Sequence, residues 1–93
     1  MHKKNLRKYR NKIDELDNKI FILIKNRTHL IKHILSEKKF KNQIVDRKRI
    51  NAILKKIKNR SIRNGIDPKI THRIWKNMIW SYINFEKKNF KKK

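Results

Sequence analysis

Residues 6–34 read LRKYRNKIDELDNKIFILIKNRTHLIKHI. Apolar residues recur here in alternating steps of three and four, the spacing of a long helix that packs along another helix. This seam comprises Leu6, Tyr9, Ile13, Leu16, Ile20, Leu23, Arg27, Leu30 and Ile34. Arg27 is its one charged member, and burying an unpaired charge costs several kcal/mol. The pattern therefore predicts that an anionic group meets Arg27; the structural alternative is a polar residue that fixes helix register.

The composition is that of one small domain over residues 1–93. Cysteine is absent, which excludes disulfides and thiolate metal sites and favours a reducing compartment. Neither a secretory signal nor a run of about 18 apolar residues, the length that spans a bilayer, is visible. We therefore expect a soluble cytoplasmic protein with no membrane partner.

The net charge of +22 raises the question of nucleic-acid binding, because phosphate contacts depend largely on electrostatics. The lysines, however, are spread along the whole sequence apart from a short tail at residues 87–93. A dispersed lysine excess is usually a solvated surface. Nucleic acid is therefore not the expected main partner, although a basic helical module that binds nucleic acid or another protein stays open as an alternative.

One glycine and one proline divide an otherwise helical sequence. We predict a first helix from Lys4 to Lys38, followed by a looser stretch over residues 39–45. Asp46 caps a second helix that Gly65 ends, and a third helix begins at Asp67-Pro68. The expected apolar faces are Ile50, Ile53, Leu54 and Ile57 on the second helix, and Ile70, Ile74, Trp75, Met78, Ile79, Tyr82, Ile83 and Phe90 on the third. No segment has strand periodicity, so the expected fold is all-α, with three helices per chain and a very long N-terminal one.

The length of the first helix predicts a second chain. It would extend roughly 50 Å, whereas a compact globule of this chain length has a diameter of about 30 Å. The apolar seam nevertheless continues to the far end of the helix. An intertwined homodimer is the simplest way to cover the excess.

Three cations on this helix are candidates for binding a common anion. Arg27 and Lys38 are eleven residues apart, close to three turns, and therefore share a face. Arg10 lies about 25 Å before Arg27 along the axis, so it can reach the same ligand only from the partner chain of an antiparallel dimer. Glu86 lies on the apolar stripe of the third helix, seven residues after Ile79. The structural alternative for Glu86 is an ion pair with one of the many lysines.

The order and spacing of these residues resemble the all-helical chorismate mutases over nearly the whole chain. The resemblance is carried by LRKYRNKIDELD at residues 6–17, by Arg27 and Lys38, and by the stretches at 46–49 and 65–68 that lead to Glu86. It implies an intramolecular isomerase that rearranges chorismate to prephenate in aromatic amino acid biosynthesis. It also implies a homodimer with shared active sites and no cofactor. We expect no metal site either: His29 and His33 share a helix face, but no glutamate follows the first in zincin fashion.

The resemblance also implies a role for each cation of the first helix. Arg10, donated by the partner subunit, and Arg27 would hold the two carboxylates of chorismate by bidentate hydrogen bonds. Lys38 would contact a carboxylate and the ether oxygen.

The resemblance places four further residues at the site, of which Glu86, Arg49 and Asp46 match family positions. Glu86 matches a glutamine or glutamate that donates a hydrogen bond to the ether oxygen, and a glutamate must be protonated to donate, which predicts better activity at mildly acidic pH. Arg49 would support the site and Asp46 would line it near the ring hydroxyl, while Tyr82 falls where the family varies. Arg27, Lys38 and Glu86 are thus the expected catalytic residues.

One departure from the family pattern keeps a second activity open. Typical members have a glutamate directly after the arginine that matches Arg49, and here Ile50 follows. An apolar residue at this position resembles the isochorismate–pyruvate lyase branch, which forms salicylate on the same fold. The stretch from Trp80 to Tyr82 resembles that branch too. The loop between Lys38 and Arg49 is about one residue shorter than usual, which leaves the match of Asp46 open.

Overall fold

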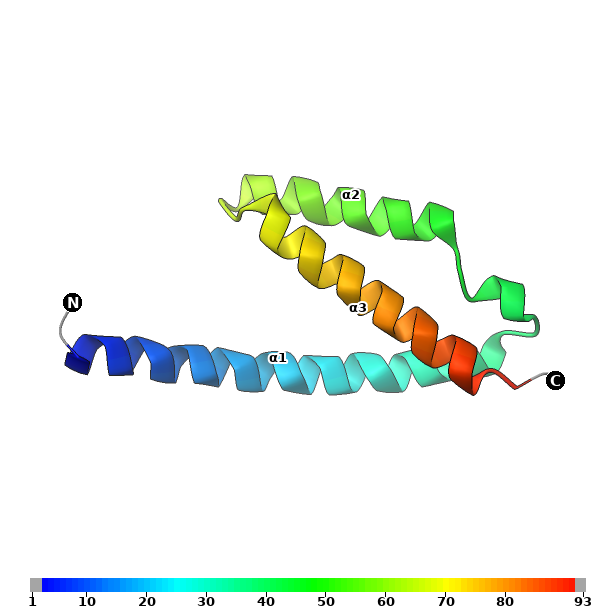
Figure 1. The fold of residues 1–93 in the computed structure, drawn as a ribbon, viewed down its shortest axis with the longest axis horizontal. Coiled ribbons are helices and arrows are strands. Elements are labelled where there is room, and N and C mark those ends of the chain that lie inside the picture. Colours follow the sequence, from blue (N-terminus) through cyan, green and yellow to red (C-terminus); the bar gives the residue numbers. More distant parts are fainter. Residues whose placement is uncertain (1–2, 92–93) are drawn as a thin grey trace. The chain divides into compact units, whose positions relative to one another are not determined.

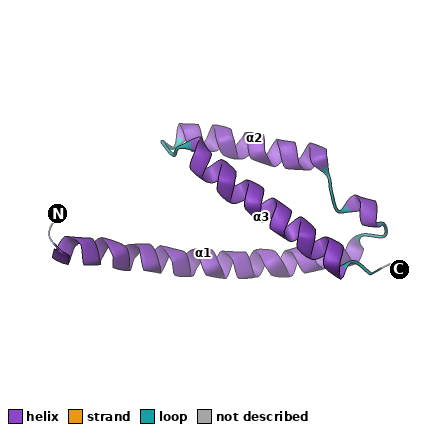
Figure 2. Ribbon diagram, in the orientation of Figure 1, coloured by secondary structure: helices purple, strands orange, loops and turns teal. Residues whose placement is uncertain are grey.

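A computed structural model describes residues 3–91 of the chain. Within this range the elements are α1 (Lys3–Glu37), the short 3₁₀ helix η1 (Lys41–Gln43), α2 (Arg47–Arg63) and α3 (Pro68–Asn89) (Figure 1). Figure 2 shows only helices and loops among these residues. The prediction of an all-α fold with three α-helices and a very long first one is confirmed. None of the described helices is long and apolar enough to cross a membrane.

The chain divides into two compact units between His33 and Ile34. The first unit is α1 as far as His33, and the second holds the last turn of α1 together with η1, α2 and α3. A single helix cannot remove an apolar seam from water by itself. The apolar members of the seam are accordingly exposed: Leu6, Tyr9, Ile13, Leu16, Ile20, Leu23, Leu30 and Ile34. The homodimer that would cover them stays a prediction.

The core of the second unit lies where α2 packs against α3. Its buried apolar residues are Ile44, Ile50, Ile79 and Ile83, and the half-buried ones around them are Leu35, Val45, Ile53, Leu54, Trp80 and Phe90. The predicted inward face of α2 is therefore confirmed. That of α3 is confirmed only in part, because Ile70 and Ile74 are 56% and 52% exposed.

Local hydrogen bonds account for where α2 and α3 begin. Asp46 accepts a hydrogen bond from the backbone N–H of Arg49 at 3.0 Å, which caps α2. Asp67 accepts one from the N–H of Lys69 at 2.9 Å, and Pro68 is the first residue of α3. Both predicted caps are confirmed. Phe90, which helical spacing put on the third helix, lies just beyond the end of α3, because its backbone angles are extended.

Gly65 ends the turn after α2, as predicted. Its φ of 68° lies in the left-handed region that glycine adopts without steric cost. The turn is closed by a backbone hydrogen bond from Ile66 to the carbonyl of Ser61 at 2.9 Å. The buried Ser61 hydroxyl also lies 2.7 Å from the Thr71 hydroxyl, which joins α2 to α3 next to the turn.

Candidate active site

The backbone holds Lys38 at the end of α1. Its N–H donates to the carbonyl of Leu35 at 3.1 Å, closing the last turn of the helix. Leu35 in turn packs against the hydrophobic core. These contacts fix the backbone of Lys38, and its side chain is only 19% exposed.

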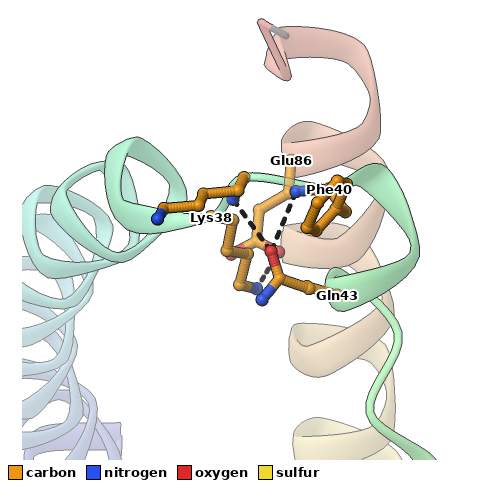
Figure 3. Close-up of polar contacts among 5 residues, drawn as sticks. Lys38, Phe40, Gln43 and Glu86 are labelled. Carbon is orange, nitrogen blue, oxygen red and sulfur yellow. Dashed lines mark hydrogen bonds and ion pairs between the residues drawn. The ribbon is translucent and has the colours of Figure 1, made fainter. Parts of the chain in front are cut away.

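Gln43 organises the chain immediately after Lys38. Its side-chain oxygen accepts hydrogen bonds from the N–H groups of Lys39 at 2.8 Å and Phe40 at 2.9 Å (Figure 3). The N–H of Gln43 donates back to the Phe40 carbonyl at 3.0 Å. Sequence reasoning missed both η1 and this role. The available signal was an amide side chain three to four residues after the backbone donors that it satisfies, which is how capping side chains act.

Glu86 brings the C-terminal half of the chain to Lys38. It lies on α3 on the same face as Ile79 and Ile83 and is 4% exposed, so the predicted inward orientation is confirmed. Lys38 Nζ donates to Glu86 Oε2 at 3.0 Å (Figure 3). A carboxylate buried this deeply needs a compensating charge, because removing one partner of a buried ion pair costs as much as about 3–5 kcal/mol.

The Lys38–Glu86 pair has a chemistry suited to an anionic guest. An ammonium group has three N–H donors, so Lys38 can donate to a ligand oxygen while it keeps its bond to Glu86. A carboxyl group can accept a hydrogen bond when ionised and donate one when protonated. The two side chains therefore place a fixed cation beside a group that can switch between accepting and donating.

Asp46 and Arg49 lie together at the start of α2. The carboxylate of Asp46 caps α2 by accepting a hydrogen bond from the backbone N–H of Arg49, and both residues are exposed. Nearby on the same helix, the Arg47 guanidinium lies 5.8 Å from the centre of the Trp80 ring, within the range of a cation–π contact. Ile50, the residue at the unusual position, is buried in the hydrophobic core.

The remaining candidate site residues lie on α1 and α3. Arg10 and Arg27 belong to the first unit, where Arg10 is exposed and Arg27 is half-buried on α1. Tyr82 is half-buried on α3, one turn before Glu86. Within the second unit the structure thus brings Lys38 and Glu86 into contact. Among residues 3–91 there is no cluster of three or more His, Asp or Glu side chains that could hold a metal ion.

Comparison with known proteins places the chain in a family. No curated protein and no solved structure matches it. Residues 9–87 match the family model described as chorismate mutase type II, a range that contains all seven candidate site residues. Because this match covers most of the 93 residues, the chain belongs to the all-helical chorismate mutase type II family.

Proposed function

We propose that the protein is a chorismate mutase, which rearranges chorismate to prephenate. In this reaction one carbon–oxygen bond breaks and one carbon–carbon bond forms within the same molecule, so no proton, electron pair or group leaves the substrate. The observation that carries the proposal is the contact between Lys38 and the buried Glu86, 48 residues apart, in a chain of this family. Catalysis of such a rearrangement requires that the substrate be positioned and that the charge of its transition state be stabilised. Cationic and hydrogen-bonding side chains such as Lys38 and Glu86 supply both effects.

We assign the binding of the substrate dianion to the cations. Arg27 and the Arg10 of a second copy hold the two carboxylates and keep the substrate in its compact reactive shape. Lys38 and protonated Glu86 donate to the ether oxygen, on which negative charge grows in the transition state. Asp46, Arg49 and Tyr82 line the site around the ring.

The proposed assembly is a homodimer in which the single domain of each chain contributes to both sites. Its support is the exposed apolar seam of α1, a helix of 35 residues that is about 52 Å long at 1.5 Å per residue. A second copy brings an identical seam in antiparallel orientation. The lack of cysteine supports a reducing setting, and we place the activity in cytoplasmic aromatic amino acid biosynthesis.

The test of this function is an ultraviolet assay of the purified chain with chorismate and isochorismate side by side. Conversion of chorismate to prephenate without salicylate is the expected result. If neither substrate is turned over, the mutase proposal fails, and salt-dependent binding to nucleic acid becomes the next property to measure.

Ile50 supports isochorismate–pyruvate lyase as the second candidate. Its side chain packs in the core with Ile44, Ile79 and Ile83, so α2 offers no carboxylate at this position for a ring hydroxyl. In the same assay, formation of salicylate and pyruvate from isochorismate would identify the lyase.

Replacing Glu86 with glutamine is expected to remove the pH dependence of turnover. A glutamine amide donates a hydrogen bond at every pH, whereas the glutamate must first be protonated. We expect kcat/KM of the unmodified protein to fall by up to about tenfold per pH unit on the alkaline side, and that of Glu86→Gln to stay level. The measurement is kcat/KM between about pH 5 and pH 8.

The control for this experiment is Glu37→Gln, which removes an exposed carboxylate near the end of α1. It should keep the pH profile of the unmodified protein. A Glu86→Gln profile with the original alkaline slope would remove Glu86 from the proposed role.

Mixing two inactive variants is expected to restore activity if the site is shared between chains. Arg10→Ala and Arg27→Ala homodimers each lack one cation in both sites. A mixed dimer has one site with both cations and one with neither. Unfolding and refolding an equal mixture should therefore give about a quarter of the activity of the unmodified protein, since half of the dimers are mixed and each has one complete site.

The matched comparison is the activity of each variant refolded alone, which should stay at background. No recovery in a mixture that size exclusion shows to be dimeric would mean that Arg10 and Arg27 do not complete one site from two chains.

A further inference from the structure

A cavity of about 580 Å³ lies in the α2–α3 hairpin, and its lining includes neither Lys38 nor Glu86. Two half-buried side chains, Leu54 and Pro68, supply apolar surface. The exposed cations around them are Lys55 and Lys58 from α2 and Lys69 and Arg73 from α3. The whole cavity belongs to the second unit.

The charge of this cavity is one-sided. Its lining contains no aspartate or glutamate. Lys55 and Lys58 are three residues apart on α2, and Lys69 and Arg73 are four residues apart on α3. The two members of each pair therefore lie on one helix face, and their positive charges repel each other. An anion that sits among all four cations relieves both repulsions at once, and helix α3 begins at the same place with the positive end of its dipole.

The size and the apolar surface restrict what kind of anion fits. Ligand pockets in proteins have volumes of about 300–1,000 Å³, which includes this cavity. A bare inorganic ion fills little of this volume and gains nothing from contact with Leu54 and Pro68. A nucleic-acid backbone gains its affinity from phosphate contacts along a track of cations and likewise leaves the apolar surface unused.

We propose that this groove is a second binding site, distinct from Lys38 and Glu86, for a small organic anion that has an apolar ring and one or two acidic groups. The ring covers Leu54 and Pro68, and the acidic groups lie between the cations of α2 and those of α3. The site does not depend on the mutase activity.

The test is a fluorescence titration of the full chain with 1-anilinonaphthalene-8-sulfonate, an aromatic sulfonate that has the proposed chemistry. The variant Lys58→Glu/Arg73→Glu reverses the charge of one lining residue on α2 and one on α3. The matched control, Lys48→Glu/Lys76→Glu, makes the same change of charge on the same two helices at exposed positions outside the cavity lining. Circular dichroism checks that both variants keep the helical content of the unmodified chain.

We expect the cavity variant to weaken binding of the probe by about tenfold or more, and the control by no more than about twofold. Inorganic phosphate at equal ionic strength should displace the probe no better than chloride does. Equal losses in the two variants would show attraction by net charge alone and overturn the proposal. Unchanged affinity in both would place the probe on another apolar surface, such as the α1 seam, and overturn it too. Efficient displacement by phosphate would show that the apolar ring is not recognised.

Discussion

Arg27→Ala is expected to reduce kcat/KM for chorismate by about a thousandfold or more while the protein stays folded and associated. The guanidinium would hold a substrate carboxylate through two parallel hydrogen bonds in a partly desolvated position, and alanine supplies neither the charge nor the geometry. The measurement is kcat/KM by ultraviolet absorbance, together with the mass in solution from light scattering. The control is Arg7→Ala, which removes an exposed arginine from α1 outside the seam.

Arg27→Lys separates charge from geometry in the same position. Lysine keeps the positive charge but cannot form the paired hydrogen bonds of a guanidinium. We expect it to recover only a small part of the lost activity. If Arg27→Ala instead keeps full turnover but changes the state of association, Arg27 is a residue that fixes helix register, and the assignment to the substrate is wrong.

Lys38→Met is expected both to reduce turnover by about a hundredfold or more and to destabilise the fold. Turnover falls because no cation then faces the ether oxygen. Stability is lost because Glu86 is 4% exposed and loses its charge partner, which we expect to lower the free energy of unfolding by about 3–5 kcal/mol. The measurement for stability is urea unfolding followed by circular dichroism.

A second substitution separates these two effects. In Lys38→Met/Glu86→Gln no buried charge remains, so most of the lost stability should return while turnover stays low. Lys39→Met, which changes the exposed neighbouring lysine, should leave both properties unchanged. If the single and the double variant unfold at the same urea concentration, the lost stability does not come from an unpaired charge on Glu86.

The starts of α2 and α3 and the turn that ends α2 were predictable because the interactions that define them are local. Asp46, Asp67 and Gly65 act within a few residues of their own position, through a capping hydrogen bond or a left-handed backbone angle. The inward orientation of Glu86 was predictable for a related reason, since helical periodicity alone puts it on the face of Ile79 and Ile83. The resemblance to the chorismate mutases rests on the same kind of information, and the family match over residues 9–87 confirms it.

Other features depend on contacts between residues distant in the sequence. Helical spacing put Ile70 and Ile74 on the same predicted face as Ile79, yet both are exposed. Spacing predicts which residues share a face, but how far along the helix that face is covered depends on what packs against it. The role of Gln43 is different, because its side chain satisfies backbone donors only three and four residues away. That local signal was present in the sequence and was missed.

The amino acid order alone, through periodicity and capping, was enough to specify three α-helices, the starts of α2 and α3, and the inward face of α2. Tertiary packing selected Glu86, among seven acidic residues, as the ion-pair partner of Lys38, and it left Ile70 and Ile74 exposed. The physical reason is that a helix is stabilised by hydrogen bonds between residues four apart, which the local sequence encodes. An ion pair that spans 48 residues forms only after the loop and the α2–α3 core have brought its two ends together.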